Sequence, residues 1–259
     1  NILKSKMAIR TEVKGAAYWI TFDNEKRKNA LSSQMYIELC QAMDEANAME
    51  EILVTVITGS GEYFSSGKDF SPEEAGKVDY KNLDYELGGS RFLRRIIGHT
   101  KVIIGLVNGP AIGIGCTMLG LFDYLVCSDS AYFLTPFTKI GITPEGTSSA
   151  VFERIIGTSN ATEMLLFGEA MSAKKALDCG FVSHVFPKAE FSQKAGALIE
   201  KLAKLPKHSV IASKELCRGQ KWRRDILSIH NEESDRLRKM FVHEDTIKII
   251  ESRYQKAKM

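Results

Sequence analysis

Asn108-Gly-Pro-Ala-Ile-Gly-Ile-Gly115 is the stretch around which the rest of the chain is arranged. One apolar run, 101–107, precedes it and another, 116–121, follows it, so the order predicts a buried strand, a glycine-rich turn and a helix. The first N–H groups of such a helix have no partner within it, and they lie at the positive end of the helix dipole. This arrangement suits an anion, or an oxygen on which negative charge develops.

The composition is that of an ordinary α/β protein: 259 residues, 44% hydrophobic and 26% charged, with 20 glycines. No run reaches the roughly 20 apolar residues that a membrane span needs, and a net charge of +3 is too small to imply a nucleic-acid partner. The five cysteines are odd in number and widely spaced, which favours free thiols in a reducing compartment. The five histidines are scattered, so we expect no metal site.

The first half of the chain repeats the order strand, strand, helix, which predicts stacked ββα units. A hairpin is expected at 9–13 and 17–22, with its turn at Lys14-Gly15, and Ser32 is expected to cap the helix that follows. Tyr63–Phe70 is interpreted as a short strand that runs into a tight turn. Further strands are expected at 53–57, 102–107, 124–127 and 131–134.

From about Ser148 onward the pattern is helical, with helices expected at 148–156, 159–167, 172–178, 190–203, 208–217, 223–240 and 244–254. A composition shift near 204–206 separates a core, 1–200, from a C-terminal helical region, 201–259. Apolar faces in that region need a partner surface, so we expect a homo-oligomer. The charged run Arg218–Arg224 is interpreted as a solvated or intersubunit face, and 71–90 as a mobile, weakly helical insert.

Several common motifs fail in this sequence. The segment 61–69 has the wrong glycine spacing for a P-loop and ends in Asp69, where Ser or Thr would bind magnesium. Gly113-x-Gly115 is followed by Met118, where a dinucleotide fingerprint needs a third glycine. No Gly-x-Ser-x-Gly elbow is present. Glycine turns after the strands at 53–57 and 102–107 therefore carry the functional prediction.

Two segments about forty residues apart, Ser65-Ser66-Gly67-Lys68-Asp69-Phe70 and Val107–Gly115, resemble the signature segments of the crotonase (enoyl-CoA hydratase/isomerase) superfamily. The resemblance extends from Asn24 to the C-terminal helices and includes Asn29-Ala30-Leu31-Ser32. It implies an α/β spiral of stacked ββα units, a helical oligomerisation region that forms a homotrimer or a dimer of trimers, and an acyl-CoA substrate. It implies no separate cofactor, because coenzyme A is part of the substrate.

In this superfamily two backbone N–H groups bind the thioester oxygen, and these donors correspond to Lys68 and Ile114. Residues implied to bind the acyl-CoA are Ser65, Ser66, Gly67, Lys68, Asp69, Phe70, Ala30 and Gly113. Lysine departs from the small residue that the family often has at the first donor position. We hypothesise that the Lys68 ammonium leans toward a phosphate of coenzyme A.

The two glutamates of the hydratases are replaced here by Thr117 and Phe137, neither of which can act as a base near neutral pH. Hydration is therefore expected to be absent or trace. Thr143-Pro-Glu-Gly146 instead resembles the Δ3,Δ2-enoyl-CoA isomerases, particularly the peroxisomal type, and Glu145 matches their catalytic glutamate. The resemblance implies that one carboxylate moves the double bond of a 3-enoyl-CoA to the trans-2 position, by a 1,3-proton shift in the β-oxidation of unsaturated fatty acids.

Alternatives remain open. On its own, Glu145 also fits the first turn of a helix, and the chain could be a non-catalytic acyl-CoA-binding module or a dienoyl-CoA isomerase. The last three residues, Ala257-Lys258-Met259, resemble a variant peroxisomal signal, with mitochondria as the alternative location. Residues 1–7 contain neither an initial methionine nor an apolar signal core, so we expect a longer precursor.

Overall fold

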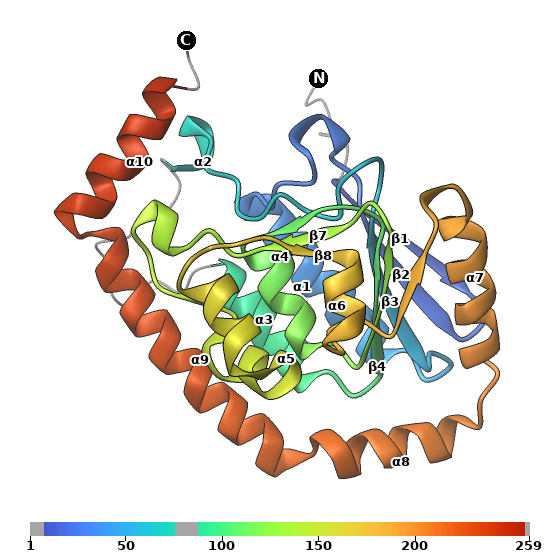
Figure 1. Cartoon of the computed structure of the whole chain (residues 1–259). Coiled ribbons are helices and arrows are strands. Elements are labelled where there is room, and N and C mark those ends of the chain that lie inside the picture. Colours follow the sequence, from blue (N-terminus) through green and yellow to red (C-terminus); the bar gives the residue numbers. More distant parts are fainter. Residues whose placement is uncertain (1–7, 76–87, 257–259) are drawn as a thin grey trace, which may run out of the picture.

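The computed structural model describes residues 8–75 and 88–256, with a six-stranded sheet at the centre of the molecule (Figure 1). The strand order is β1-β2-β3-β4-β6-β9. β1 pairs antiparallel with β2, and the other described pairs in this sheet are parallel. The strands are β1 (Ile9–Lys14), β2 (Ala17–Phe22), β3 (Val54–Gly59), β4 (Val102–Val107), β6 (Tyr124–Ser128) and β9 (His184–Phe186).

Helices cover both faces of this sheet, which explains why successive residues of β3 and β4 are buried and no alternation of buried and exposed residues is seen. On one face, α1 (Ser33–Ala48), α3 (Gly88–Gly98) and α5 (Ser148–Leu165) enclose the larger core. On the other face, α7 (Phe191–Leu202) packs its apolar side chains against the strands, and Figure 1 shows it on the opposite side of the sheet from α1 and α3.

A second, three-stranded sheet has the order β5-β7-β8. Its strands are β5 (Ala111–Ile112), β7 (Tyr132–Leu134) and β8 (Met171–Ser172). β4 and β5, and likewise β6 and β7, follow each other in sequence, so these units contribute one strand to each sheet. A bridge between Ser65 and Ala111 adds the segment after β3 to the same arrangement. The predicted α/β fold of stacked ββα units is therefore confirmed.

Local predictions are confirmed in some places and wrong in others. Ser32 caps α1, and its hydroxyl accepts the N–H of Met35 at 3.2 Å. The hairpin turn lies at residues 15–16, one residue later than predicted, because Lys14 still pairs with Ala17. Tyr63–Phe70 forms isolated bridges and no strand, because its N–H groups are divided between two segments: those of 64 and 65 donate to Pro110, and those of 66 and 69 donate to residues 28 and 31.

The turn after β4 is followed by less regular helix than the apolar run 116–121 predicts. A single turn, α4 (Ile114–Thr117), passes directly into the 3₁₀ helix η2 (Met118–Leu121). The N–H groups of Cys116 and Thr117 both donate to the carbonyl of Gly113, so this turn combines a 3₁₀-type and an α-type hydrogen bond. The two helices expected at 148–156 and 159–167 are the two halves of α5, which bends at Gly157.

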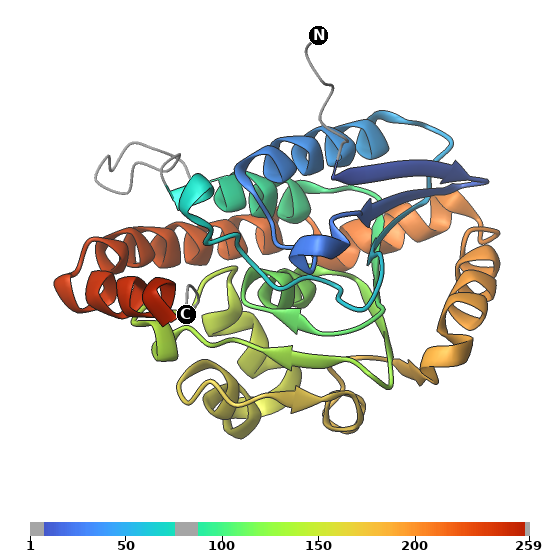
Figure 2. The same cartoon turned by 90° about the horizontal axis from the view of Figure 1, so that it is seen from above.

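The C-terminal helices wrap around the core, as Figure 2 shows. The apolar face of α9 was expected to need a partner surface, but Ile226, Leu237 and Phe241 pack into the larger core of this chain. In the insert expected at 71–90, α2 covers 72–75 and α3 begins at Gly88, and 76–87 lie outside the described residues. The remaining helices are η1 (Glu25–Arg27), α2 (Pro72–Ala75), η3 (Thr138–Ile140), α6 (Ala173–Asp178), η4 (Lys188–Glu190), α8 (Lys207–Arg218), α9 (Gln220–Phe241) and α10 (Glu244–Lys256).

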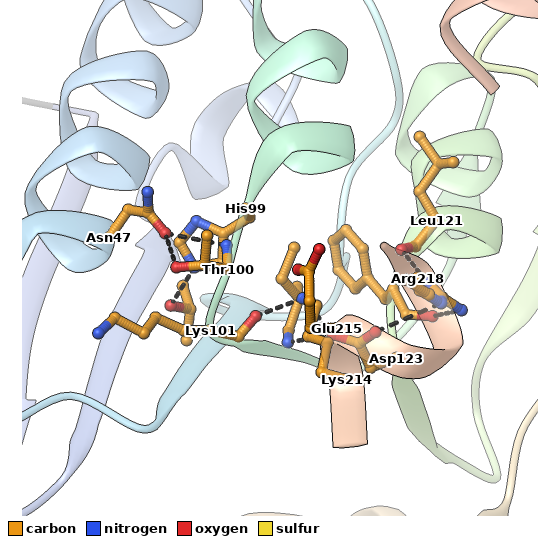
Figure 3. Close-up of polar contacts among 12 residues, drawn as sticks. Asn47, His99, Thr100, Lys101, Leu121, Asp123, Lys214, Glu215 and Arg218 are labelled. Carbon is orange, nitrogen blue, oxygen red and sulfur yellow. Dashed lines mark hydrogen bonds and ion pairs between the residues drawn. The ribbon is translucent and has the colours of Figure 1, made fainter. Parts of the chain in front are cut away.

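A buried ion-pair cluster fastens α8 to the end of the central sheet (Figure 3). Lys214 donates to Asp123 at 2.8 Å and to the carbonyl of Lys101, and Arg218 lies 3.4 Å from the same carboxylate. Arg218 also donates to the carbonyls of Leu121 and Phe122. The run that begins at Arg218 was interpreted as a solvated or intersubunit face, but Arg218 itself bonds within this chain. Across the described helices, none is long and apolar enough to cross a membrane.

Candidate active site

A cavity brings together four segments that lie far apart in sequence: the loop after β3, the start of α4, the turn before α5, and α9. Eight of the predicted site residues line it: Ser66, Gly67, Lys68, Asp69, Phe70, Gly113, Ile114 and Glu145. Ala30 and Ser65 do not. Ser65 lies beneath the loop, where its buried hydroxyl donates to the carbonyl of Asn29 and accepts the N–H of Gly67.

Backbone geometry directs two N–H groups away from the core of the fold. The carbonyl of Gly67 and the N–H of Asp69 both bond to Leu31, at 2.8 and 3.0 Å. Because successive groups of an extended segment point in opposite directions, the N–H of Lys68 points away from Leu31. Ile114 is the first residue of α4, so its N–H has no acceptor within that helix.

The two loops can approach each other because residue 67 is glycine. Its φ of +90° lies in the region that favours glycine, and an added Cβ would lie 2.7 Å from the carbonyl oxygen of Ile112. Lys68 and Ile114 therefore line the same cavity from adjacent loops.

Glu145, on the turn before α5, lines the same cavity. Its Oε1 accepts a hydrogen bond from the hydroxyl of Thr117 at 2.7 Å, and the apolar side chains of Phe137, Ile140 and Ile142 also line the cavity. Burial raises the pKa of Glu145 to about 7, and the negative charge of Glu233 adds to this effect. The Thr117 hydrogen bond and the Lys68 ammonium act in the opposite direction. A carboxyl group with a pKa near neutrality is well matched to proton transfer.

The ammonium of Lys68 lies among aromatic rings, 5.2 Å from the ring centre of Phe241 and 5.8 Å from that of Phe70. Burial lowers its pKa to about 8, although Glu145 and Glu74 raise it. The idea that this group contacts a phosphate of coenzyme A stays a prediction. It requires that Lys68→Ala weaken acyl-CoA binding and reduce its dependence on salt.

Two further acidic side chains, Asp69 and Glu74, line the cavity, and both accept hydrogen bonds from other residues of the protein. Asp69 accepts from Arg27 at 3.1 Å and from the N–H of Ser71 at 2.8 Å. Glu74 accepts the N–H of Ser33 at 2.7 Å. Within residues 8–75 and 88–256, no group of three or more His, Cys, Asp or Glu side chains could hold a metal ion.

Sequence reasoning missed three contributions to the site. Thr117 was recognised as the replacement for a hydratase glutamate, but not as the hydrogen-bond donor to Glu145. Leu237 and Phe241 line the cavity, and their spacing of four residues on a helix was the available signal. Glu233, which bonds to the turn that carries Glu145, had no signal, because its partners lie more than 80 residues away.

Comparisons with known proteins agree with this geometry. The family model for enoyl-CoA hydratase/isomerase matches residues 12–258. The rat (Rattus norvegicus) protein enoyl-CoA delta isomerase 2 is 37% identical over 236 residues, which cover 90% of this chain and 60% of the rat protein. The peroxisomal enoyl-CoA delta isomerase 3 of the mouse (Mus musculus) is 37% identical over 205 residues, 77% of this chain and 63% of the mouse protein. This chain thus spans less than two thirds of either relative.

Among solved structures, the enoyl-CoA hydratase/isomerase from Pseudoalteromonas atlantica T6c superposes with a TM-score of 0.87 at 27% identity. The superposition covers 96% of this chain and 98% of the bacterial one. Sequence and fold therefore agree over nearly the whole length, and the chain belongs to the enoyl-CoA hydratase/isomerase family.

Proposed function

We propose that the protein is a Δ3,Δ2-enoyl-CoA isomerase, which converts a 3-enoyl-CoA into the trans-2-enoyl-CoA. The observation that carries the proposal is the position of Glu145, whose pKa is raised to about 7, on the wall of the cavity that Lys68 and Ile114 also line. The two relatives named enoyl-CoA delta isomerase support the same class of reaction.

In the proposed mechanism, the carboxylate of Glu145 removes a proton from C2 of the substrate. The electron pair of that C–H bond forms a C1–C2 double bond, and the carbonyl π electrons move onto the thioester oxygen, which gives a dienolate conjugated with the C3–C4 double bond. The N–H groups of Lys68 and Ile114 bind the oxygen that becomes negative, and each such donor typically contributes about 3 kcal/mol. The carboxyl group of Glu145 then returns its proton to C4, so the enzyme ends in its starting state. When C4 is protonated, the carbonyl re-forms and the double bond comes to lie between C2 and C3.

The apolar surroundings of Glu145 fit a shift in which the same proton is carried from one carbon to another. Phe137, Ile140 and Ile142 limit the access of water, which would exchange that proton. Thr117 and Phe137 provide no carboxylate that could activate a water molecule, so we propose that hydration is absent or trace.

The decisive experiment incubates the protein with trans-3-hexenoyl-CoA and follows the absorbance of the conjugated thioester that isomerisation creates. We expect turnover, with little hydration of trans-2-hexenoyl-CoA in a parallel assay. No turnover, combined with tight binding of the acyl-CoA, would favour the alternative of a non-catalytic acyl-CoA-binding module.

A second candidate is a dienoyl-CoA isomerase, which relies on more than one acid in the cavity. The presence of Asp69 and Glu74 on the cavity wall favours it, whereas their contacts with Arg27 and Ser33 favour a structural role. A 3,5-dienoyl-CoA substrate separates the two candidates, because the first predicts that it reacts slowly or not at all.

The proposal includes a cellular setting. The reaction belongs to the β-oxidation of unsaturated fatty acids, and we propose the peroxisome as its location, because a relative carries that word in its name and Ala257-Lys258-Met259 resembles a peroxisomal signal. These three residues lie outside the described part of the chain. We further propose a homotrimer or a dimer of trimers.

A further inference from the structure

Glu233 reaches from α9 to the start of α5 and accepts three hydrogen bonds there. Its Oε2 accepts the N–H of Thr147 at 2.5 Å, and its Oε1 accepts the N–H of Ser149 at 2.9 Å and the hydroxyl of Ser149 at 2.5 Å. Only 6% of Glu233 is exposed. A carboxylate buried to this degree is normally retained only where its hydrogen bonds are well made.

The turn that Glu233 holds has an unfavourable backbone conformation. Gly146 and Thr147 both have positive φ, +70° and +64°, and Thr147 is β-branched, for which this region is an outlier. Glycine adopts this conformation readily, whereas a β-branched residue such as Thr147 keeps it only where its surroundings impose it. The side chain of Thr147 makes no cap for α5 and donates instead to the carbonyl of Gly146. Glu233 therefore serves as the N-terminal cap that α5 does not have in its own sequence.

This turn carries Glu145. The hydroxyl of Ser148, in the first turn of α5, donates to the carbonyl of Glu145 at 2.7 Å, so the backbone of Glu145 is tied to the start of the helix that Glu233 caps. On the other side, Gly146 lies against Thr117: a Cβ at residue 146 would come within 2.6 Å of the Thr117 hydroxyl oxygen. A small rotation of the turn would thus separate Glu145 from the hydroxyl that binds it.

We infer that Glu233 is a positioning residue, which fixes the turn 145–149 so that the carboxyl group of Glu145 stays on Thr117 and faces the cavity. The inference rests on the proposed function for its kinetic consequences. The position of the Glu145 carboxyl group, however, can be measured without any turnover.

The negative charge of Glu233 provides a second readout. The charged groups that act on Glu145 are Glu233 from α9, which raises its pKa, and Lys68 from the loop after β3, which lowers it. Cys116 of α4 also faces Glu145, and burial raises the pKa of its thiol, so it stays neutral. Loss of this charge alone would lower the pKa of Glu145, whereas a turn that also moves away from Thr117 loses a hydrogen bond with a larger and opposite effect, so the inference predicts a higher pKa.

The test compares Glu233→Gln with Glu232→Gln. Gln preserves the size of the side chain but removes the charge and one of the two acceptor oxygens. Glu232 is the matched control, because it is exposed on the same helix and pairs with Arg236. For Glu233→Gln we expect kcat to fall about 10- to 100-fold with KM within about twofold, the loss typical of a misplaced catalytic group. Because the Thr117 hydrogen bond is lost, the acid limb of the kcat profile should move to higher pH, and Glu232→Gln should match the wild type in both.

The second arm titrates Glu145 by NMR of ¹³C-labelled carboxyl groups, with the signal identified by its absence in Glu145→Gln. A higher pKa of Glu145 in Glu233→Gln supports the inference even if the wild type does not isomerise 3-enoyl-CoA, an outcome that overturns the proposed function alone. An unchanged or lower Glu145 pKa, or a lower melting temperature with unchanged kcat and acid limb, shows that the turn stays in place without Glu233 and overturns the inference.

Discussion

Glu145 has one specific chemical task in the proposed reaction, which makes its replacement informative. Glu145→Gln keeps the shape of the side chain but removes the base, so kcat should fall by about 10²- to 10⁴-fold. The affinity for an acyl-CoA, measured by isothermal titration calorimetry, should change little. Activity within tenfold of the wild type would mean that another group moves the proton.

The hydroxyl of Thr117 should tune that base. A hydrogen bond donated to a carboxylate stabilises the charged form, and the bond from Thr117 lowers the pKa of Glu145 against the larger effect of burial. Thr117→Val removes the donor with little change of volume, so we expect the acid limb of the kcat profile to move to higher pH. Glu233→Gln should move the limb in the same direction, because it is inferred to break the same hydrogen bond. Thr138→Val, at an exposed position of η3, is the control and should leave the limb in place.

The sequence predicted some residues of the site and not others. The loops of Lys68 and Ile114 could be recognised from glycines beside apolar runs, because two backbones that approach closely leave no room for a side chain. Glu145 was recognised through its resemblance to isomerases. Neither the hydrogen bond that Thr117 donates nor those that Glu233 accepts could be predicted, because each depends on how the turn before α5 packs, and no local pattern encodes that contact.

Helix α8 illustrates how one element depends on a buried charge. The Lys214 side chain is only 8% exposed, and Asp123 is the carboxylate that it meets in the cluster of Figure 3. Asp123→Asn keeps the acceptor for the N–H of Ile103 but leaves the ammonium without its counter-charge. Breaking such a pair typically costs about 3–5 kcal/mol. Urea denaturation should show this loss.

A double-mutant cycle distinguishes this explanation from general damage. Lys214→Met removes the cation, so Asp123→Asn combined with Lys214→Met should recover much of the stability that Asp123→Asn alone loses. Additive losses in the double mutant would mean that the two side chains act independently.

Elements whose partners are near in sequence were predicted best. The serine cap of α1 and the hairpin follow from local hydrogen bonding and alternation, and Gly157 marks the bend in α5. Tyr63–Phe70 was wrongly predicted as a strand, because its backbone bonds to Pro110 and to residues 28–31 in turn. Strand composition predicts an extended chain but does not specify which segment pairs with it.

The stability of the whole molecule should depend on pH through His99. This side chain bonds to the hydroxyl of Thr55 at 2.8 Å, and burial, reinforced by Lys214 and Lys101, lowers its pKa from the usual 6.5 to about 3. Above pH 6.5 the ring is neutral in both states. Between pH 6.5 and 3 the unfolded chain binds a proton that the folded protein excludes, so stability falls as the pH falls.

At pH 5 this effect amounts to about 2 kcal/mol. His99→Gln lacks the titrating group, so the difference in unfolding free energy between it and the wild type should change by about that amount between pH 7 and pH 5. Urea titrations at the two pH values measure it. A difference that stays constant would show that His99 binds a proton in the folded protein as readily as in the unfolded chain.

The cavity takes its walls from distant parts of the chain, and this has a consequence for biosynthesis. Leu237 and Phe241 of α9 face the loop of Lys68 across the cavity, although Leu237 follows Lys68 by 169 residues. A nascent polypeptide that has emerged only as far as α7 has both sheets but lacks this wall. We therefore expect the complete cavity to form only after α9 has been synthesised, and premature termination before that helix to yield a product that lacks this wall.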